Sequence, residues 1–205
     1  MDKTICIFGD SVVHASFMKV GWVDLFRQYL EKKYPNDSIE IYNLGISGNT
    51  SEDILKRFEA EILARDTTSI IIAVGVNDSG YIQDPSNPIV RKEQFALNLK
   101  KLVDTAFKYT QDITFIGLVL GDDSILQPFP GSSSGKAYRK DLVETYDEII
   151  KKVAEKNSCK YIHLLDKLDF EDFQDGLHPN DNGHRKMFEV IKKHFRCLTS
   201  TPLVV

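Results

Sequence analysis

The sequence is poor in cysteine and carries no excess of positive charge. Its three cysteines, Cys6, Cys159 and Cys197, form no C-x-x-C pair. An odd and unpatterned set argues against a disulfide framework and against a cysteine-based metal or redox site, and it fits a reducing compartment. The formal net charge of −4 gives no sign of the excess of basic residues that binding to nucleic acid or to an anionic membrane requires.

Long hydrophobic runs are also lacking at the N-terminus. The apolar stretch at residues 4–8 is too short for the central region of a signal peptide or for a membrane span. We therefore expect a cytoplasmic protein without a membrane span. The length of 205 residues and a hydrophobic content of 42% suit one domain with a sizeable core. We expect that domain over residues 1–198 and a frayed tail over residues 199–205.

What the chain does have is a regular alternation of short apolar runs and longer helical patterns. The expected strands cover residues 4–8, 39–43, 69–74, 113–119 and 160–164. The expected helices cover residues 21–33, 51–64, 92–108, 136–156 and 181–196. Continuous apolar strands are typical of sheets buried on both faces, and successive βα units favour parallel pairing. The pattern predicts a flavodoxin-like α/β fold, a three-layer α/β/α sandwich around a central five-stranded parallel sheet.

Gly9-Asp10-Ser11 stands where the first predicted strand turns toward a helix. The carboxyl ends of parallel strands form the ligand-binding edge of such a sheet. The start of a helix directs amide groups and a positive dipole end at a developing anion, which suits a serine nucleophile at Ser11. The same residues can also simply cap a helix.

Asp175-Gly176-Leu177-His178-Pro179 lies just before the last predicted helix. A carboxylate three residues before a histidine can bond to one imidazole nitrogen and leave the other nitrogen for a serine. This spacing indicates His178 as a general base oriented by Asp175.

Two further motifs follow the second and third predicted strands. In the first, residues 43–51, Gly48 leaves its amide sterically open. In the second, Gly75-Val76-Asn77-Asp78, Asn77 offers two side-chain N–H donors and Asp78 can pin the loop. Either motif on its own is also compatible with an ordinary turn.

In their order along the chain, the four motifs resemble the sequence blocks of the SGNH hydrolase superfamily, also called GDSL-like lipases and esterases. The resemblance covers nearly the whole chain and implies the same three-layer fold. It implies an ester hydrolase with Ser11, Asp175 and His178 as catalytic residues and no metal or other cofactor. It places an oxyanion hole at the Ser11 amide, the Gly48 amide and the Asn77 side chain. The implied partner is a small-molecule ester, and the family's range includes small acyl esters, acetylated sugars, lysophospholipids and thioesters.

Two long loops, residues 79–91 and 121–135, leave the predicted sheet at its ligand-binding edge. The second contains apolar side chains able to cover a small acyl group. It also contains Asp122 and Asp123, whose charge repels phosphate head groups. We therefore expect acetyl to butyryl esters of neutral alcohols or sugars as substrates, with lysophospholipase or thioesterase activity as the alternative within the family.

Two other classes of function remain open alternatives. A metal-dependent phosphoesterase would use Asp10, Asn77, Asp175 and His178 as ligands, although two-metal hydrolysis needs a denser cluster. A non-catalytic flavodoxin-like binding module would need none of these residues.

Two more features of the sequence are possible site elements. The segment from Gly131 to Lys136 is one residue short of a phosphate-binding loop and does not follow the first strand. His14, one helical turn beyond Ser11, borders the pocket or is a partly exposed helix residue.

Overall fold

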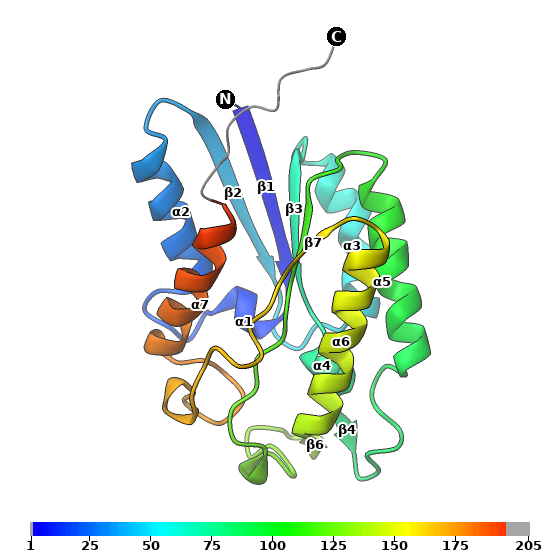
Figure 1. Cartoon of the computed structure of the whole chain (residues 1–205). Coiled ribbons are helices and arrows are strands. Elements are labelled where there is room, and N and C mark those ends of the chain that lie inside the picture. The colour runs from blue at the N-terminus through cyan, green and yellow to red at the C-terminus, as the bar shows by residue number, and fades with distance from the viewer. Residues whose placement is uncertain (1, 196–205) are drawn as a thin grey trace.

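Five parallel strands form the central sheet of the computed structural model, which describes residues 2–195 (Figure 1). Their order across the sheet is β2 (Ser38–Gly45), β1 (Asp2–Gly9), β3 (Ser69–Ala73), β5 (Ile113–Ile116) and β7 (Lys160–Ile162). The chain order reverses at β1, and sheets of this kind bind ligands at that switch point. The predicted flavodoxin-like fold with a five-stranded parallel sheet is confirmed.

Helices cover both faces of the sheet (Figure 1). One face carries α2 (Trp22–Lys33) and α7 (Asp181–His194), and the other carries α3 (Ser51–Leu63), α5 (Lys92–Ala106) and α6 (Lys140–Lys156). Strand β1 shows why its sequence is apolar without alternation. Ile5 and Ile7 pack in the core beneath α2 and α7, whereas Cys6 and Phe8 pack beneath α3 and α5. All four side chains are fully buried, as expected for a strand covered on both faces.

Several short elements gather at the carboxyl ends of the strands. They are α1 (Ser11–His14), α4 (Val76–Ser79), β4 (Tyr81–Ile82), β6 (Lys136–Ala137) and two 3₁₀ turns, η1 (Asp123–Ile125) and η2 (Phe170–Asp172). Strands β4 and β6 form a separate antiparallel pair. The helix predicted from residue 136 begins only at Lys140, because Lys136 and Ala137 pair with β4 instead. That part of the prediction is wrong.

Other predicted boundaries differ from the structure by a few residues. The strand predicted over 113–119 ends at Ile116, because the Leu118 amide donates to the buried Asp147 carboxylate at 2.8 Å instead of to a neighbouring strand. The last helix ends at His194. The predicted end of that helix at residue 196 and the predicted tail over 199–205 lie outside the described residues. Among the helices of residues 2–195, none combines the length and the apolar character that crossing a membrane requires.

Gly9 lets α1 and β3 approach β1 closely. A Cβ atom at this position would lie 2.2 Å from Val13 Cγ2 and 2.5 Å from the main-chain oxygen of Ala73. Overpacking of this kind typically costs about 1–3 kcal/mol.

We expect Gly9→Ala to lower the free energy of unfolding by roughly that amount, measured by urea denaturation. Adding Val13→Ala should not restore stability, because the Ala73 oxygen belongs to the backbone and stays in place. A Gly9→Ala protein as stable as the wild type would contradict this account of the packing.

Candidate active site

Ser11 is the first residue of α1 and lies two residues after Gly9, the end of β1. At this position a helix leaves the main-chain amide without a helical partner. Asp10 caps the helix, since its Oδ1 accepts from the Val12 amide at 2.9 Å. The Asp10 side chain is buried, and burial raises its pKa to about 6. The sequence therefore presents a half-buried serine at the switch point of the sheet.

Ser11, His178 and Asp175 form one continuous chain of contacts. His178 Nε2 lies 3.1 Å from Ser11 Oγ, and His178 Nδ1 lies 2.8 Å from Asp175 Oδ2. The other carboxylate oxygen of Asp175 accepts from the amides of Leu177 and His178 at 3.0 and 2.8 Å. Burial alone raises the pKa of Asp175, but hydrogen bonds from the ring and amide of His178 outweigh it and hold the pKa below its usual value. A carboxylate that stays ionised can orient the imidazole and stabilise its cationic form.

Several hydrogen bonds and one ring contact hold the loop that carries Asp175 and His178 in place. Asn180 caps α7, since its side-chain oxygen accepts from two amides in the first turn of that helix. The Gln174 amide donates to the His178 carbonyl at 3.0 Å. Phe129 packs edge-on against the His178 ring, with the ring centroids 5.8 Å apart. The loop over residues 121–135 therefore borders this site.

Asn77, in α4, is almost completely buried beside Asp10. Its side-chain nitrogen donates to the Asn49 carbonyl at 3.2 Å and to Asp10 Oδ2 at 3.4 Å. Its side-chain oxygen accepts from Lys136 Nζ and from the Tyr138 hydroxyl, each at 3.2 Å. The donor end of the Asn77 amide thus faces the residues next to Ser11. Sequence reasoning gave Lys136 and Tyr138 no part in this site.

Gly48 lies in an exposed turn after β2, with a φ of +83° that favours glycine. Two contacts hold this turn next to α1. The Ile46 amide donates to the Gly9 carbonyl at 3.1 Å, and Ser47 Oγ lies 3.1 Å from His14 Nδ1. His14 is exposed and contacts the Gly48 turn rather than Ser11. Its place beside that turn agrees with a position at the border of the site.

A buried polar cluster connects the loop of Asn77 to the start of α3. Asp78 accepts from the Ser51 amide at 2.9 Å and from the Ser51 hydroxyl at 2.5 Å. Asn98, from α5, donates to the same hydroxyl at 2.9 Å. Asp78 is fully buried, and this desolvation raises its pKa to about 7 despite the hydrogen bonds from Ser51, with the nearby Asp10 charge adding to the rise.

A small cavity of about 10 Å³ opens beside Ser11 and His178. Its walls are mainly apolar and include Phe17 and Met18. His184 also lines it, although the sequence offered no partner for this histidine. The His184 ring is buried and its Nδ1 accepts from the Trp22 amide at 3.4 Å. Burial lowers the pKa of His184 to about 4, which keeps the ring neutral at neutral pH.

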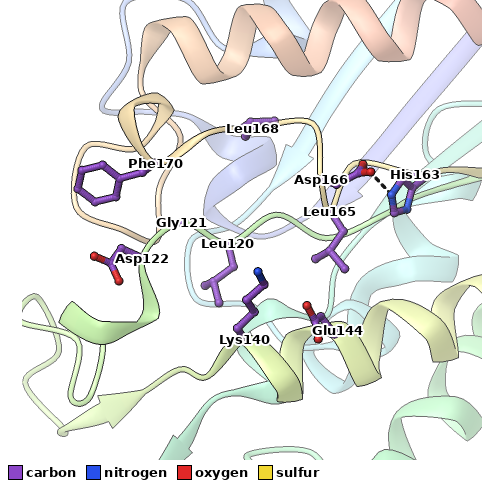
Figure 2. Close-up of a pocket in the computed structure, with 10 residues that line it drawn as sticks. All are labelled: Leu120, Gly121, Asp122, Lys140, Glu144, His163, Leu165, Asp166, Leu168 and Phe170. Atoms are coloured by element: carbon purple, nitrogen blue, oxygen red, sulfur yellow. Dashed lines mark ion pairs between the residues drawn. The ribbon is translucent and has the colours of Figure 1, made fainter.

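A much larger cavity, about 600 Å³, lies at the same edge of the sheet (Figure 2). The Gly121 amide in its wall donates to the Gly176 carbonyl at 2.9 Å, so the cavity adjoins the loop of Asp175 and His178. It combines leucine side chains and a Phe170 ring that is 63% exposed with charged groups. The ionisable lining residues are Asp122, Lys140, Glu144, His163 and Asp166. Figure 2 shows Lys140 and Glu144 rising from α6 toward the cavity.

Potential metal ligands are not clustered in the described part of the chain. Within residues 2–195, no group of three or more His, Cys, Asp or Glu side chains is placed to hold a metal ion. Asp10 and Asp175, two of the ligands that a phosphoesterase would use, form hydrogen bonds with Asn77 and His178.

The chain is similar to known proteins in both sequence and structure. The model of the GDSL-like lipase/acylhydrolase family matches residues 7–186. An acetylxylan esterase of Geobacillus stearothermophilus is 22% identical over 142 residues, which cover 69% of this chain and 62% of that protein. The uncharacterised lipoprotein YqeF of Bacillus subtilis strain 168 is 28% identical over 109 residues, which cover 52% of this chain and 44% of that protein. The chain thus covers less than two thirds of these curated relatives.

Solved structures share the fold over nearly the full chain. LAE5, an α/β hydrolase enzyme from the metagenome of Lake Arreo in Spain, superposes with a TM-score of 0.76 at 18% identity and covers 98% of this chain and 99% of its own. Axe2, an acetylxylan esterase from Geobacillus stearothermophilus, gives 0.76 at 19% identity, with coverage of 95% and 94%. Solved catalytic mutants of Axe2 replace a serine, an aspartate and a histidine three positions after that aspartate.

The raised pKa of Asp78 makes a prediction about stability and pH. An aspartate in the unfolded chain titrates near its ordinary value of 3.8, whereas Asp78 in the folded protein titrates near 7. Between these values the folded state binds the proton more tightly, so this contribution to stability is lost as the pH rises toward 7.

We expect Asp78→Asn to gain stability relative to the wild type as the pH is raised from about 5 to about 8. Urea denaturation of both proteins at the two pH values measures the difference. Asp84→Asn is the control, because exposed Asp84 has a lowered pKa and is ionised at both values. A constant difference between Asp78→Asn and wild type would contradict the prediction.

Proposed function

This chain belongs to the GDSL-like lipase/acylhydrolase family, and on that premise we propose that it is a serine esterase that hydrolyses carboxylic esters through an acyl-enzyme. The observation that carries the proposal is the chain of contacts from Ser11 through His178 to Asp175. Serine, histidine and a carboxylate in this order of contact activate a hydroxyl for attack on a carbonyl. The catalytic mutants of Axe2, which change the same three residue types, support the same assignment.

In the proposed reaction, Ser11 Oγ attacks the carbonyl carbon of the ester while His178 Nε2 takes the hydroxyl proton. The bond from that carbon to the alcohol oxygen then breaks, and His178 returns the proton to the leaving alcohol. Water attacks the acyl carbon with His178 again taking a proton. The acyl–Ser11 bond breaks, Ser11 regains the proton, and the carboxylic acid leaves. Asp175 keeps the imidazole oriented and stabilises its cation.

The negative oxygen of each tetrahedral intermediate is proposed to accept from the Ser11 amide, the Gly48 amide and the Asn77 side chain. The position of Ser11 at the start of α1, where a helix leaves its amide without a helical partner, supports this assignment. So do the open backbone at Gly48 and the Asn77 nitrogen, which lies against Asp10 next to Ser11. Donors placed before the charge develops stabilise the transition state more than the ground state, and losing one typically costs about 10²–10³ in turnover.

The proposed substrates are short-chain acyl esters, acetyl to butyryl, of neutral alcohols or sugars. The cavity beside Ser11 is small and mainly apolar, which favours a short acyl group. The cavity of about 600 Å³ is large enough for part of a sugar chain, and Phe170 offers an exposed ring for stacking. Asp122, Glu144 and Asp166 outnumber the single Lys140 in its lining, so it disfavours phosphate groups. The Geobacillus stearothermophilus relatives are acetylxylan esterases, which agrees with this choice.

We expect Ser11→Ala to lower kcat for p-nitrophenyl acetate by about 10³-fold or more and to abolish labelling by a fluorophosphonate. His178→Ala should be nearly as damaging, because its imidazole carries every proton transfer. Asp175→Asn should cost no more than His178→Ala, since it disturbs orientation and tautomer only.

The control for this series is His14→Ala, which should change turnover only modestly because His14 contacts Ser47 rather than Ser11. Fluorophosphonate labelling that persists in Ser11→Ala, or near wild-type turnover of His178→Ala, would contradict the assignment of the catalytic triad. Loss of activity in EDTA would favour the metal-dependent phosphoesterase instead.

For substrate choice, kcat/KM should be highest for acetyl to butyryl esters and fall with longer chains. Phe170→Ala should raise KM for an acetylated oligosaccharide by about 2- to 10-fold, as expected for the loss of one aromatic contact, and leave p-nitrophenyl acetate unchanged. Leu63→Ala, another exposed apolar residue, is the matched control. A preference for acyl chains of about ten carbons, or for lysophospholipids over acetylated sugars, would overturn this substrate assignment but not the triad.

A further inference from the structure

The amide oxygen of Asn77 is fixed by two donors, Lys136 and Tyr138. Each lies 3.2 Å from this oxygen, and burial raises the pKa of Tyr138, so its hydroxyl keeps its proton and donates. Because both groups donate, the oxygen is the acceptor end of the amide. The nitrogen end is thereby turned toward Asn49 and Asp10, beside Ser11. The direction in which Asn77 donates therefore depends on Lys136 and Tyr138.

The small sheet of β4 and β6 explains how Lys136 reaches Asn77, which lies 59 positions earlier in the chain. Strand β4 begins two residues after α4, the helix that holds Asn77. Strand β6 pairs with it so that Ile82 lies opposite Lys136 and Tyr81 opposite Ala137. This pairing fastens Lys136 to the segment that contains Asn77 and holds the two side chains in register.

The Lys136 ammonium bonds to a neutral amide rather than to a carboxylate. It forms no ion pair within residues 2–195. Burial lowers its pKa, while the charges of Asp78, Asp10 and Asp53 act in the opposite direction. A cation bonded to an amide oxygen polarises the amide, and this strengthens the N–H groups of the same amide as donors.

We propose that Lys136 is a positioning residue of the oxyanion hole, which orients Asn77 and strengthens its side-chain N–H as the negative charge develops on the substrate oxygen. The proposal rests on the esterase function proposed above. Tyr138, which is neutral, contributes to the orientation of Asn77 but not to the charge. Because the need for a strong donor grows as the oxyanion forms, Lys136 acts on kcat more than on KM.

This role also explains the segment from Gly131 to Lys136, which falls one residue short of a phosphate-binding loop. The segment turns back on itself, since the Lys136 amide donates to Ser132 Oγ at 2.8 Å and the Lys136 carbonyl accepts from the Phe129 amide at 2.9 Å. The Lys136 side chain points to Asn77 and not into this turn. The glycines and serines therefore serve the return of the chain into β6.

The first test is a double-mutant cycle on p-nitrophenyl acetate, a substrate too small to need the larger cavity. Lys136→Met should lower kcat by about 10- to 100-fold, less than the loss of a donor itself, with KM changed by less than about 3-fold. In an Asn77→Ala background, the same change should cost less than about 3-fold, because the group through which Lys136 acts is gone. Lys151→Met, an exposed lysine on α6, is the control.

The second test uses Lys136→Arg, which keeps the charge at high pH. This variant should retain most of the wild-type kcat at neutral pH. As the pH rises through the lowered pKa of Lys136, the wild type should lose turnover because Lys136 loses its proton, whereas Lys136→Arg should not. The three carboxylates whose charges act on Lys136, and the Tyr138 hydroxyl, keep one charge state in the alkaline range. Asp10, Asp53 and Asp78 are already ionised, and the pKa of Tyr138 is raised above its usual value.

The outcomes separate this proposal from the esterase function. If Ser11→Ala is inactive but Lys136→Met keeps wild-type kcat, or loses as much in the Asn77→Ala background as alone, Lys136 has no part in the oxyanion hole and the esterase function stands. If Lys136→Met does not fold, identical alkaline profiles of the wild type and Lys136→Arg overturn the proposal. If the wild type hydrolyses no ester, both proposals fall.

Discussion

The parallel register of β1 with its two neighbours is the constraint on which the site depends. Gly9, the last residue of β1, lies opposite Gly45 of β2 and Ala73 of β3, so three strands end at one level. Ser11, Gly48 and Asn77 follow these ends by two, three and four residues. A shift of one residue in either pairing would move one of the three groups away from the others and turn alternate side chains to the wrong face. Close packing at Gly9 leaves little room for such a shift.

Buried polar groups then fix the loops that leave this level. Asp10 caps α1 and accepts from Asn77, and Asp78 accepts from Ser51. Burying two carboxylates is unfavourable, as their raised pKa values indicate. The hydrogen bonds of these carboxylates connect the loops that follow β1, β2 and β3 to one another. The buried carboxylates therefore lower the stability of the fold and at the same time hold the loops of the site in place. Such a combination is common where a protein positions reactive groups.

Much of this arrangement was predictable from the sequence, because its signals are local. The apolar runs predicted the five strands, and the three-residue spacing of Asp175 and His178 predicted a contact that the structure contains. The start of α6 was not predictable in this way, because β6 exists only through pairing with β4 from more than fifty residues earlier in the chain. The bonds of Lys136 to Asn77 and of His184 to Trp22 join residues far apart in the sequence, and local patterns give no sign of such contacts.

The central claim, that Ser11 carries the acyl group, is tested most directly by trapping that intermediate. The wild-type protein would be mixed with an acetyl ester, quenched in acid within milliseconds, digested and examined by mass spectrometry. The account predicts one acetyl group, about 42 Da in mass, on the peptide that contains Ser11, appearing before steady state and disappearing when the ester is exhausted. An active enzyme that carries the acetyl group on another residue, or on none at any time, would contradict it.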